Sequence, residues 1–325
     1  MTDRIRWGII STARIGLNSV IPAIEASGNG VVSAISSRSL ESAQAAAAEI
    51  GIPHAYGSYT DLIESGEVDA IYNPLPNHLH AEWSIACAEA GIPTLCEKPL
   101  ALNATEAQRM VDAFAARDVL LGEAFMYRYH PQHDRVRDLM DEGAIGEVQS
   151  IRSAFTFRIG NEEDIRLRAD MGGGGVMDVG CYCINAMRLL TGEEPEDVAA
   201  IANFGAVSGV DEHLAALLRF PSGIIGHFHC GLRTYREHRY VVSGSTGRIV
   251  VPQAFGPKTG TPTVIRLETD DTARVIELPD VNQYVLMVED FAGAILENRP
   301  LRFPIEDGVR NMAVIDRLLA SARGA

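Results

Sequence analysis

The chain has 325 residues, of which 46% are hydrophobic, and its formal net charge at pH 7 is -15. A chain of this length and apolar content can bury more than one core, so we expect two domains. The acidic balance argues against a nucleic-acid groove, because phosphate binding needs clustered Lys and Arg.

The opening residues are too polar to begin a signal peptide, and no apolar run in the sequence is long enough to span a membrane. The five cysteines form no disulfide-like framework and fit a reducing compartment. We therefore expect a cytoplasmic protein with neither a membrane nor a nucleic acid as partner.

Strand and helix patterns alternate in the N-terminal third. Short apolar runs predict strands at 5–10, 31–35, 68–72 and 93–96, and helices at 42–50 and 80–90. This alternation indicates an α/β domain with a doubly wound parallel sheet, the Rossmann fold. Because the alternation ends near 121–123, we expect a dinucleotide-binding domain at 1–123 and a substrate-binding and oligomerisation α+β domain at 124–325.

The turn after the first strand is where a dinucleotide pyrophosphate would meet a helix N-terminus. The usual fingerprint G-x-G-x-x-G is degraded here to S-x-A-x-x-G at 11–16, which keeps small residues at all three places. The residues that could bring backbone N–H groups to a phosphate are Ser11, Thr12, Ala13, Arg14 and Ile15. A structural turn without a cofactor is the alternative.

Ser36, Ser37 and Arg38 follow the second strand. A fold that prefers NAD normally has Asp or Glu here, to accept from the ribose 2′-hydroxyl. Two hydroxyls and a guanidinium suit a 2′-phosphate instead. The sequence thus favours NADP over NAD, with an exposed loop arginine as the alternative.

Two later segments offer groups that could move a proton on a substrate oxygen. Lys98 lies at the end of the fourth strand, and Asp178 and Tyr182 follow a glycine run at 172–175. If that stretch is helical, Asp178 and Tyr182 emerge one turn apart on one face. A free tyrosine titrates near ~10, so a cation such as Lys98 is needed to make it a base closer to neutrality. A solvated lysine and a flexible glycine loop are the alternatives.

Taken together, these segments resemble a known family. The strand–turn start, the segment PLPNHLH at 74–80, the EKP at 97–99 and the glycine run leading to Asp178 and Tyr182 occur in the order found in the glucose-fructose oxidoreductase, inositol dehydrogenase and rhizopine-catabolism (Gfo/Idh/MocA) superfamily. With Tyr rather than His at 182, the chain resembles the branch of dimeric dihydrodiol dehydrogenases and NADP-dependent xylose dehydrogenases. Asn185 departs from the Asp that the family often has, so sugar recognition is expected to differ.

The resemblance implies hydride transfer between the nicotinamide of NADP and a secondary alcohol or hemiacetal, or the matching carbonyl, of a sugar, sugar derivative or cyclic diol. It implies that Tyr182 exchanges the proton, that Lys98 contacts the nicotinamide ribose and the substrate hydroxyl, and that Asp178 orients the substrate or the lysine. Further cofactor contacts are expected at Pro74, Asn77, His80 and Glu97. A non-catalytic NADP-binding regulator on the same fold is the alternative function.

Beyond the first domain, alternating patterns predict a large, open, mostly antiparallel sheet. Its expected strands are 148–157, 198–204, 214–220, 223–230, 239–243, 248–251 and 263–267. One face of such a sheet would be open, and similar family members pack these faces together, so we expect a homodimer or tetramer through the sheet. The candidate substrate residues are Tyr127, Arg128, Arg166, Asn185 and Tyr235, and His130 and Arg168 are further residues that could line the cleft.

The pairs His78/His80 and His227/His229, with nearby cysteines, provide the ligand types of a zinc dehydrogenase. None of them has the spacing C-x-x-C or H-E-x-x-H, and alternation makes His227 and His229 one polar face of a strand. We therefore expect no bound metal, and keep a zinc dehydrogenase as the third hypothesis.

Overall fold

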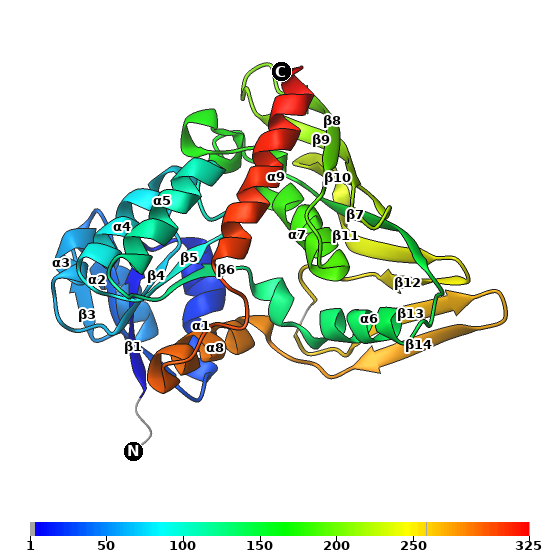
Figure 1. Cartoon of the computed structure of the whole chain (residues 1–325). Helices are drawn as coiled ribbons and strands as arrows, with labels where there is room; N and C mark the ends of the chain where they lie inside the picture. Colours follow the sequence, from blue (N-terminus) through cyan, green and yellow to red (C-terminus); the bar gives the residue numbers. More distant parts are fainter. Residues whose placement is uncertain (1–3, 258, 325) are drawn as a thin grey trace. The chain divides into compact units, whose positions relative to one another are not determined.

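Figure 1 shows the fold, a computed structural model that describes residues 4–257 and 259–324. The chain divides into two compact units, Met1–Met126 with Asn282–Val309, and Tyr127–Val281 with Arg310–Ala325. These units differ from the expected division into 1–123 and 124–325, because the chain returns to the first unit near its end. Helix α8 (Gln283–Glu297) belongs to the first unit because its Phe291 ring packs against Trp7 of the first strand, with the ring centroids 5.4 Å apart.

Among the described residues, the first unit holds a six-stranded sheet in the order β3-β2-β1-β4-β5-β6, with every neighbouring pair parallel. The strands are β1 (Ile5–Ile10), β2 (Gly30–Ser36), β3 (His54–Tyr56), β4 (Ala70–Asn73), β5 (Thr94–Glu97) and β6 (Leu121–Ala124). The doubly wound parallel sheet is confirmed. Its strand order reverses between β1 and β4, and ligands of such sheets bind at the carboxyl ends of the strands beside that point.

Helices connect these strands. They are η1 (Gly16–Val20), α1 (Ile21–Ala26), α2 (Leu40–Ile50), α3 (Tyr59–Ile63), η2 (Asn77–Leu79), α4 (His80–Glu89) and α5 (Ala104–Ala115). The expected helices at 42–50 and 80–90 correspond to α2 and α4. Each of α2, α3 and α5 begins after a Ser or Asn whose side chain accepts from a backbone N–H of the first turn, which explains where these helices start.

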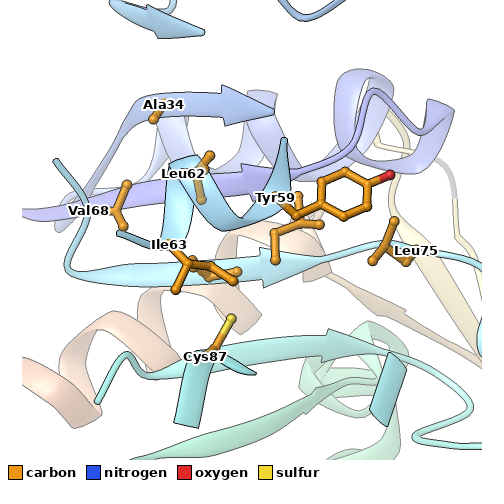
Figure 2. Close-up of a cluster of buried hydrophobic side chains, with 9 residues drawn as sticks. Ala34, Tyr59, Leu62, Ile63, Val68, Leu75 and Cys87 are labelled. Atoms are coloured by element: carbon orange, nitrogen blue, oxygen red, sulfur yellow. The ribbon is translucent and has the colours of Figure 1, made fainter. Parts of the chain in front are cut away.

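Alternation along β1 sends side chains to both faces of this sheet. Trp7 faces α8, and Ile10 joins a buried cluster with Leu62 and Ile63 of α3 and Cys87 of α4 (Figure 2). Gly8 points toward the same cluster, and a Cβ there would lie 2.9 Å from Val68 and 3.0 Å from Leu62 of α3. A side chain at this position would therefore displace the side chains of Val68 and Leu62.

Within the described residues, the second unit holds an eight-stranded sheet in the order β14-β13-β12-β11-β7-β10-β9-β8. Among the described strands of this sheet, only β7 and β10 pair in parallel, so the mostly antiparallel character is confirmed. Its strands are β7 (Val148–Arg158), β8 (Asp197–Phe204), β9 (Asp211–Arg219), β10 (Ile225–Gly231), β11 (Arg233–Gly244), β12 (Gly247–Val251), β13 (Thr263–Thr269) and β14 (Ala273–Leu278). Strand β11 begins earlier than its apolar pattern because backbone pairing with β7 continues past the apolar residues.

The helical segments of the second unit are α6 (Pro131–Asp141), η4 (Ile165–Leu167), η5 (Ala169–Met171), η6 (Val176–Gly180) and α7 (Cys181–Thr191). Two others lie across the unit boundaries, η3 (Met126–Tyr129) and α9 (Glu306–Arg323). Segments η6 and α7 are continuous and contact β7 and β10. In the chain that the structure describes, no helix is both long and apolar enough to cross a membrane.

Candidate functional site

In the first unit, the expected cofactor residues follow the carboxyl ends of β1, β2, β4 and β5, the edge at which a doubly wound sheet binds ligands. Ser11 leaves β1 with a φ of 93°, a conformation that few residues other than glycine adopt. Its backbone N–H donates to the Ser36 carbonyl at 3.0 Å, and its Oγ accepts from the Ala13 N–H at 3.3 Å. These bonds fix the turn that leads through Thr12, Arg14 and Ile15 into η1.

The end of β2 presents the groups expected to select NADP. The Ser37 N–H donates to the Tyr56 carbonyl at 3.1 Å, which places Ser37 beside β3. Arg38 follows and is exposed, and Ser39 caps the N-terminus of α2 by accepting from the Ser42 N–H. The guanidinium of Arg38 therefore stands in solvent at the start of a capped helix, where a phosphate could reach it.

The segment after β4 is held by buried polar groups. Asn73 donates to the Ser84 hydroxyl at 3.0 Å and accepts from the Leu75 N–H at 3.2 Å. The His80 ring is fully buried, with Nε2 2.7 Å from the Leu75 carbonyl and Nδ1 3.0 Å from the Pro99 carbonyl. Burial lowers the pKa of His80 to about 4, so the ring is neutral near pH 7.

His80 therefore lies between the segment after β4 and the segment after β5, with one main-chain carbonyl within reach of each ring nitrogen, and the neutral ring donates to one of the two. Pro74 is buried, and Asn77 begins η2 in a partly exposed position. The cofactor contacts expected from these three residues stay predictions.

Lys98 follows β5 in a cluster that also holds two tyrosines. Tyr72 donates its hydroxyl to Glu97 Oε1 at 2.6 Å, and the Lys98 N–H donates to Glu97 Oε2 at 3.3 Å. Burial and the Glu97 charge raise the pKa of Tyr284 to about 12, and the Lys98 cation opposes that rise. The positive charge of Lys98 thus lies close enough to act on a phenol in its own unit. Tyr72 and Tyr284 were not expected from the sequence, because an isolated tyrosine in a strand or helix carries no distinguishing pattern.

In the second unit, Asp178 and Tyr182 stand on the continuous helix of η6 and α7. The first turn is a wide π turn, so a four-residue separation still keeps both side chains on about one face. The Arg166 Nε donates to Asp178 Oδ2 at 2.8 Å, and its Nη1 donates to Asp164 at 3.3 Å. The negative charge of the Asp178 carboxylate is the main cause of the raised pKa of Arg166. The sequence placed Arg166 in the substrate cleft, and the structure joins it to the proposed catalytic carboxylate.

The Tyr182 side chain lies in a group of aromatic rings that we call the aromatic box, consisting of Tyr127, Phe155, Tyr182 and Phe255. The Tyr182 ring centroid is 5.5 Å from that of Tyr127, 5.2 Å from Phe155 and 5.5 Å from Phe255. The Tyr127 hydroxyl donates to Asn185 Oδ1 at 2.6 Å, and both residues are buried. Two expected substrate residues, Tyr127 and Asn185, are thereby brought together beside Tyr182, while the two phenylalanines were missed.

The other expected cleft residues are dispersed. Arg128 is buried in η3, and His130 is buried at the N-terminus of α6, where its Nδ1 accepts from the Gln132 N–H at 3.2 Å. Arg168 is exposed and pairs with Asp170. The Tyr235 side chain on β11 is 91% exposed, in contrast with the buried Tyr127, Tyr182 and Phe255. A contact of these residues with substrate remains a prediction.

The histidines considered as metal ligands are arranged differently. His227 and His229 share the outward face of β10, and His229 Nε2 lies 3.7 Å from Glu237. Throughout the described residues, no group of three or more His, Cys, Asp or Glu side chains is placed to hold a metal ion.

Comparison with known proteins supplies the family. Residues 5–125 match the model for the oxidoreductase family with an NAD-binding Rossmann fold, and residues 133–250 match that for the GFO/IDH/MocA C-terminal domain. The chain belongs to the GFO/IDH/MocA oxidoreductase family. This family is the one indicated by the sequence motifs, so that expectation is confirmed.

Relatives within the GFO/IDH/MocA family agree with the expected branch. The chain is 38% identical to a D-xylose 1-dehydrogenase (NADP(+)) of Haloferax volcanii, over 97% of each chain. It is 31% identical to a trans-1,2-dihydrobenzene-1,2-diol dehydrogenase of Mus musculus, over 78% of this chain and 76% of the relative. A crystal structure of a 3-ketoreductase from Actinomadura kijaniata with NADP and TDP-benzene superposes with a TM-score of 0.95, at 34% identity and covering 98% of each chain.

Proposed function

We propose that this protein is an NADP-dependent oxidoreductase acting on a secondary alcohol or hemiacetal, or the matching carbonyl, of a sugar, sugar derivative or cyclic diol. The observation that carries the proposal is the Tyr182 phenol in its aromatic box, one helical turn after a carboxylate held by Arg166. In a family of oxidoreductases, this arrangement suits Tyr182 to act as the acid–base group while a nicotinamide cofactor carries the hydride.

The donors of the first unit fit NADP. Arg38 and Ser37 follow β2 with a guanidinium and a hydroxyl, which suit a 2′-phosphate and leave no carboxylate at 36–38 to repel it. The turn after β1, from Ser11 to Ile15, lies where the pyrophosphate meets backbone N–H groups in this fold. Solved and curated relatives that hold or use NADP support the same assignment.

When bound, NADP supplies the acceptor or donor of a hydride. Tyr182 takes the proton from the substrate hydroxyl in oxidation and returns it to the carbonyl oxygen in reduction. Its ring is confined by neighbouring aromatic rings, so the phenol needs little reorganisation before proton transfer. Lys98 provides the cation that favours the phenolate, and Asp178, oriented by Arg166, accepts a hydrogen bond from the substrate or from Lys98.

The decisive experiment is a turnover screen with NADP and NAD. Substrates should include aldoses, inositols, sugar acids, aromatic trans-dihydrodiols and a dTDP-linked 3-keto sugar, the last because a relative of high structural similarity is a 3-ketoreductase. We expect NADP-dependent turnover of at least one class, insensitive to chelators. NADP binding without turnover of any class would favour the regulator, and loss of turnover on chelation would favour a zinc dehydrogenase.

We also propose that copies of this chain associate into a dimer or tetramer through the outer face of the second-unit sheet. The side chains of Ile201 on β8 and Leu217 on β9 are 80% and 56% exposed on this sheet, and exposed apolar side chains on a broad sheet favour a partner. In light-scattering measurements we expect a dimer or tetramer for the wild type and a smaller species for Leu217→Arg. Val207→Arg, in the exposed turn between β8 and β9, is the control that should leave the mass unchanged.

A cytoplasmic location is part of the same proposal. Cys87, Cys96, Cys181, Cys183 and Cys230 are all buried free thiols, which suits a reducing compartment. Cell fractionation with antibody detection would test it.

A further inference from the structure

Asp211, the first residue of β9, lies at the start of the helix that carries Asp178 and Tyr182. Its side chain is buried, and its Oδ2 accepts a hydrogen bond from the Val176 N–H at 2.7 Å. Val176 is the first residue of η6, so this N–H is one of the donors that a helix leaves without a partner at its N-terminus. A carboxylate at this position caps the helix and complements its dipole.

The glycine run before the helix is shaped around this carboxylate. Gly174 has a φ of 125°, and a Cβ there would lie 2.3 Å from Asp211 Oδ1. A Cβ on Gly175 would lie 3.0 Å from the Asp211 carbonyl oxygen. On the other side, the Gly174 N–H donates to the Arg166 carbonyl at 2.9 Å. The same short segment therefore contacts both Asp211 and the arginine that holds Asp178.

We propose that Asp211 is a positioning residue, whose ionised carboxylate fixes the first turn of the η6–α7 helix and thereby the places of Asp178 and Tyr182. Asp211 touches the helix backbone and acts on the reaction only through these two side chains. The kinetic part of this inference rests on the proposed function, and its structural part does not.

The charge of Asp211 changes within a physiological range. Burial raises the pKa of Asp211 to about 6, and the backbone N–H of Val176 and the charge of Arg323 on α9 oppose that rise. From β10, Cys230 faces the same region, and the pKa of its thiol is raised well above the usual range by burial and by the Asp211 charge, so Cys230 stays neutral. Asp211 is thus ionised above about pH 6 and neutral below it. Burial favours the neutral form of Asp211, whereas the Val176 N–H lowers the pKa of Asp211 and so favours the ionised form. The hydrogen bond itself is therefore weaker in acid, and an opening that frees the Val176 N–H while Asp211 stays buried becomes easier as the pH falls through about 6.

Hydrogen exchange of peptides covering 174–182 tests the structural part without any substrate. In the wild type, after correction for intrinsic exchange rates, we expect the protection factor to fall about fivefold as the pH drops through about 6. This is the change expected when a charge-assisted hydrogen bond is replaced by a weaker bond to a neutral carboxyl group. Asp211→Asn keeps the size and one acceptor oxygen, and should show the lower protection at every pH. Glu212→Gln is the matched control, because Glu212 is the next carboxylate on β9 and pairs with Arg233 and Ser208 instead. It should keep the wild-type step.

Absence of the step in the wild type, or its persistence in Asp211→Asn, would overturn the proposal. In the kinetic arm, we expect the ratio of wild-type kcat to Asp211→Asn kcat to fall from about five above pH 6 to about one below it, with an unchanged KM for NADP. The ratio removes the titration of Tyr182, which both proteins share. An active wild type for which this ratio does not change with pH would also overturn the positioning role. If the wild type turns over no substrate, the proposed function fails, while the exchange measurement still decides the role of Asp211.

Discussion

Replacing Tyr182 with phenylalanine removes the hydroxyl of the proposed acid–base group and leaves the ring in place. The ring is buried and packs 5.2 Å from Phe155 and 5.5 Å from Phe255, contacts that a phenyl ring preserves. We therefore expect NADP binding to change little. Turnover should fall by about two to four orders of magnitude, the range for loss of general acid–base catalysis. At about 1.4 kcal/mol for each factor of ten, this is roughly 3 to 5.5 kcal/mol of transition-state stabilisation.

The assay follows NADPH absorbance for turnover, cofactor fluorescence for NADP affinity, and thermal unfolding for stability. Tyr240→Phe is the matched control, because the buried Tyr240 hydroxyl lies 2.9 Å from His133 Nδ1 in the same unit. This control should lose stability and keep turnover within a few fold. If Tyr182→Phe turns over substrate at nearly the wild-type rate, Tyr182 is not the acid–base group.

Three further substitutions test other parts of the site. Lys98→Met should lower turnover comparably and move the pH profile to higher pH, because a nearby cation lowers the pKa of a phenol; an unchanged profile with unchanged turnover would leave Lys98 a surface charge. Arg38→Asp should weaken NADP binding about ten- to a hundredfold and NAD binding far less, as fluorescence titrations would measure, and an equal loss of both would contradict a phosphate contact. Tyr127→Phe removes the donor at 2.6 Å from Asn185 Oδ1 and should lower the free energy of unfolding by about 1–3 kcal/mol, whereas Tyr235→Phe, at a 91% exposed residue, should leave it unchanged in denaturant titrations.

The sequence was informative wherever a property depends on neighbours along the chain. Alternation of strands and helices predicted the parallel sheet, and the predicted strands lie within a few residues of β1, β2, β4 and β5. The short strands β3 and β6 were missed, because the few residues 54–56 and 121–124 carry little periodic signal. The motif spacing also put Asp178 and Tyr182 on one helix, although it gave no sign that the first turn would be a π turn.

What the sequence by itself determined was the family, the two kinds of sheet and the list of chemically able side chains, since these depend on local composition and spacing. Only the tertiary structure decided which of those side chains meet. Arg166 turned out to hold Asp178, Tyr127 to bond Asn185, and Asp211 to cap the helix from another strand. The return of α8 to the first unit was likewise decided by the packing of Phe291 on Trp7. Such contacts join residues far apart in the chain, and their distances follow from how strands and helices pack, which no local pattern encodes.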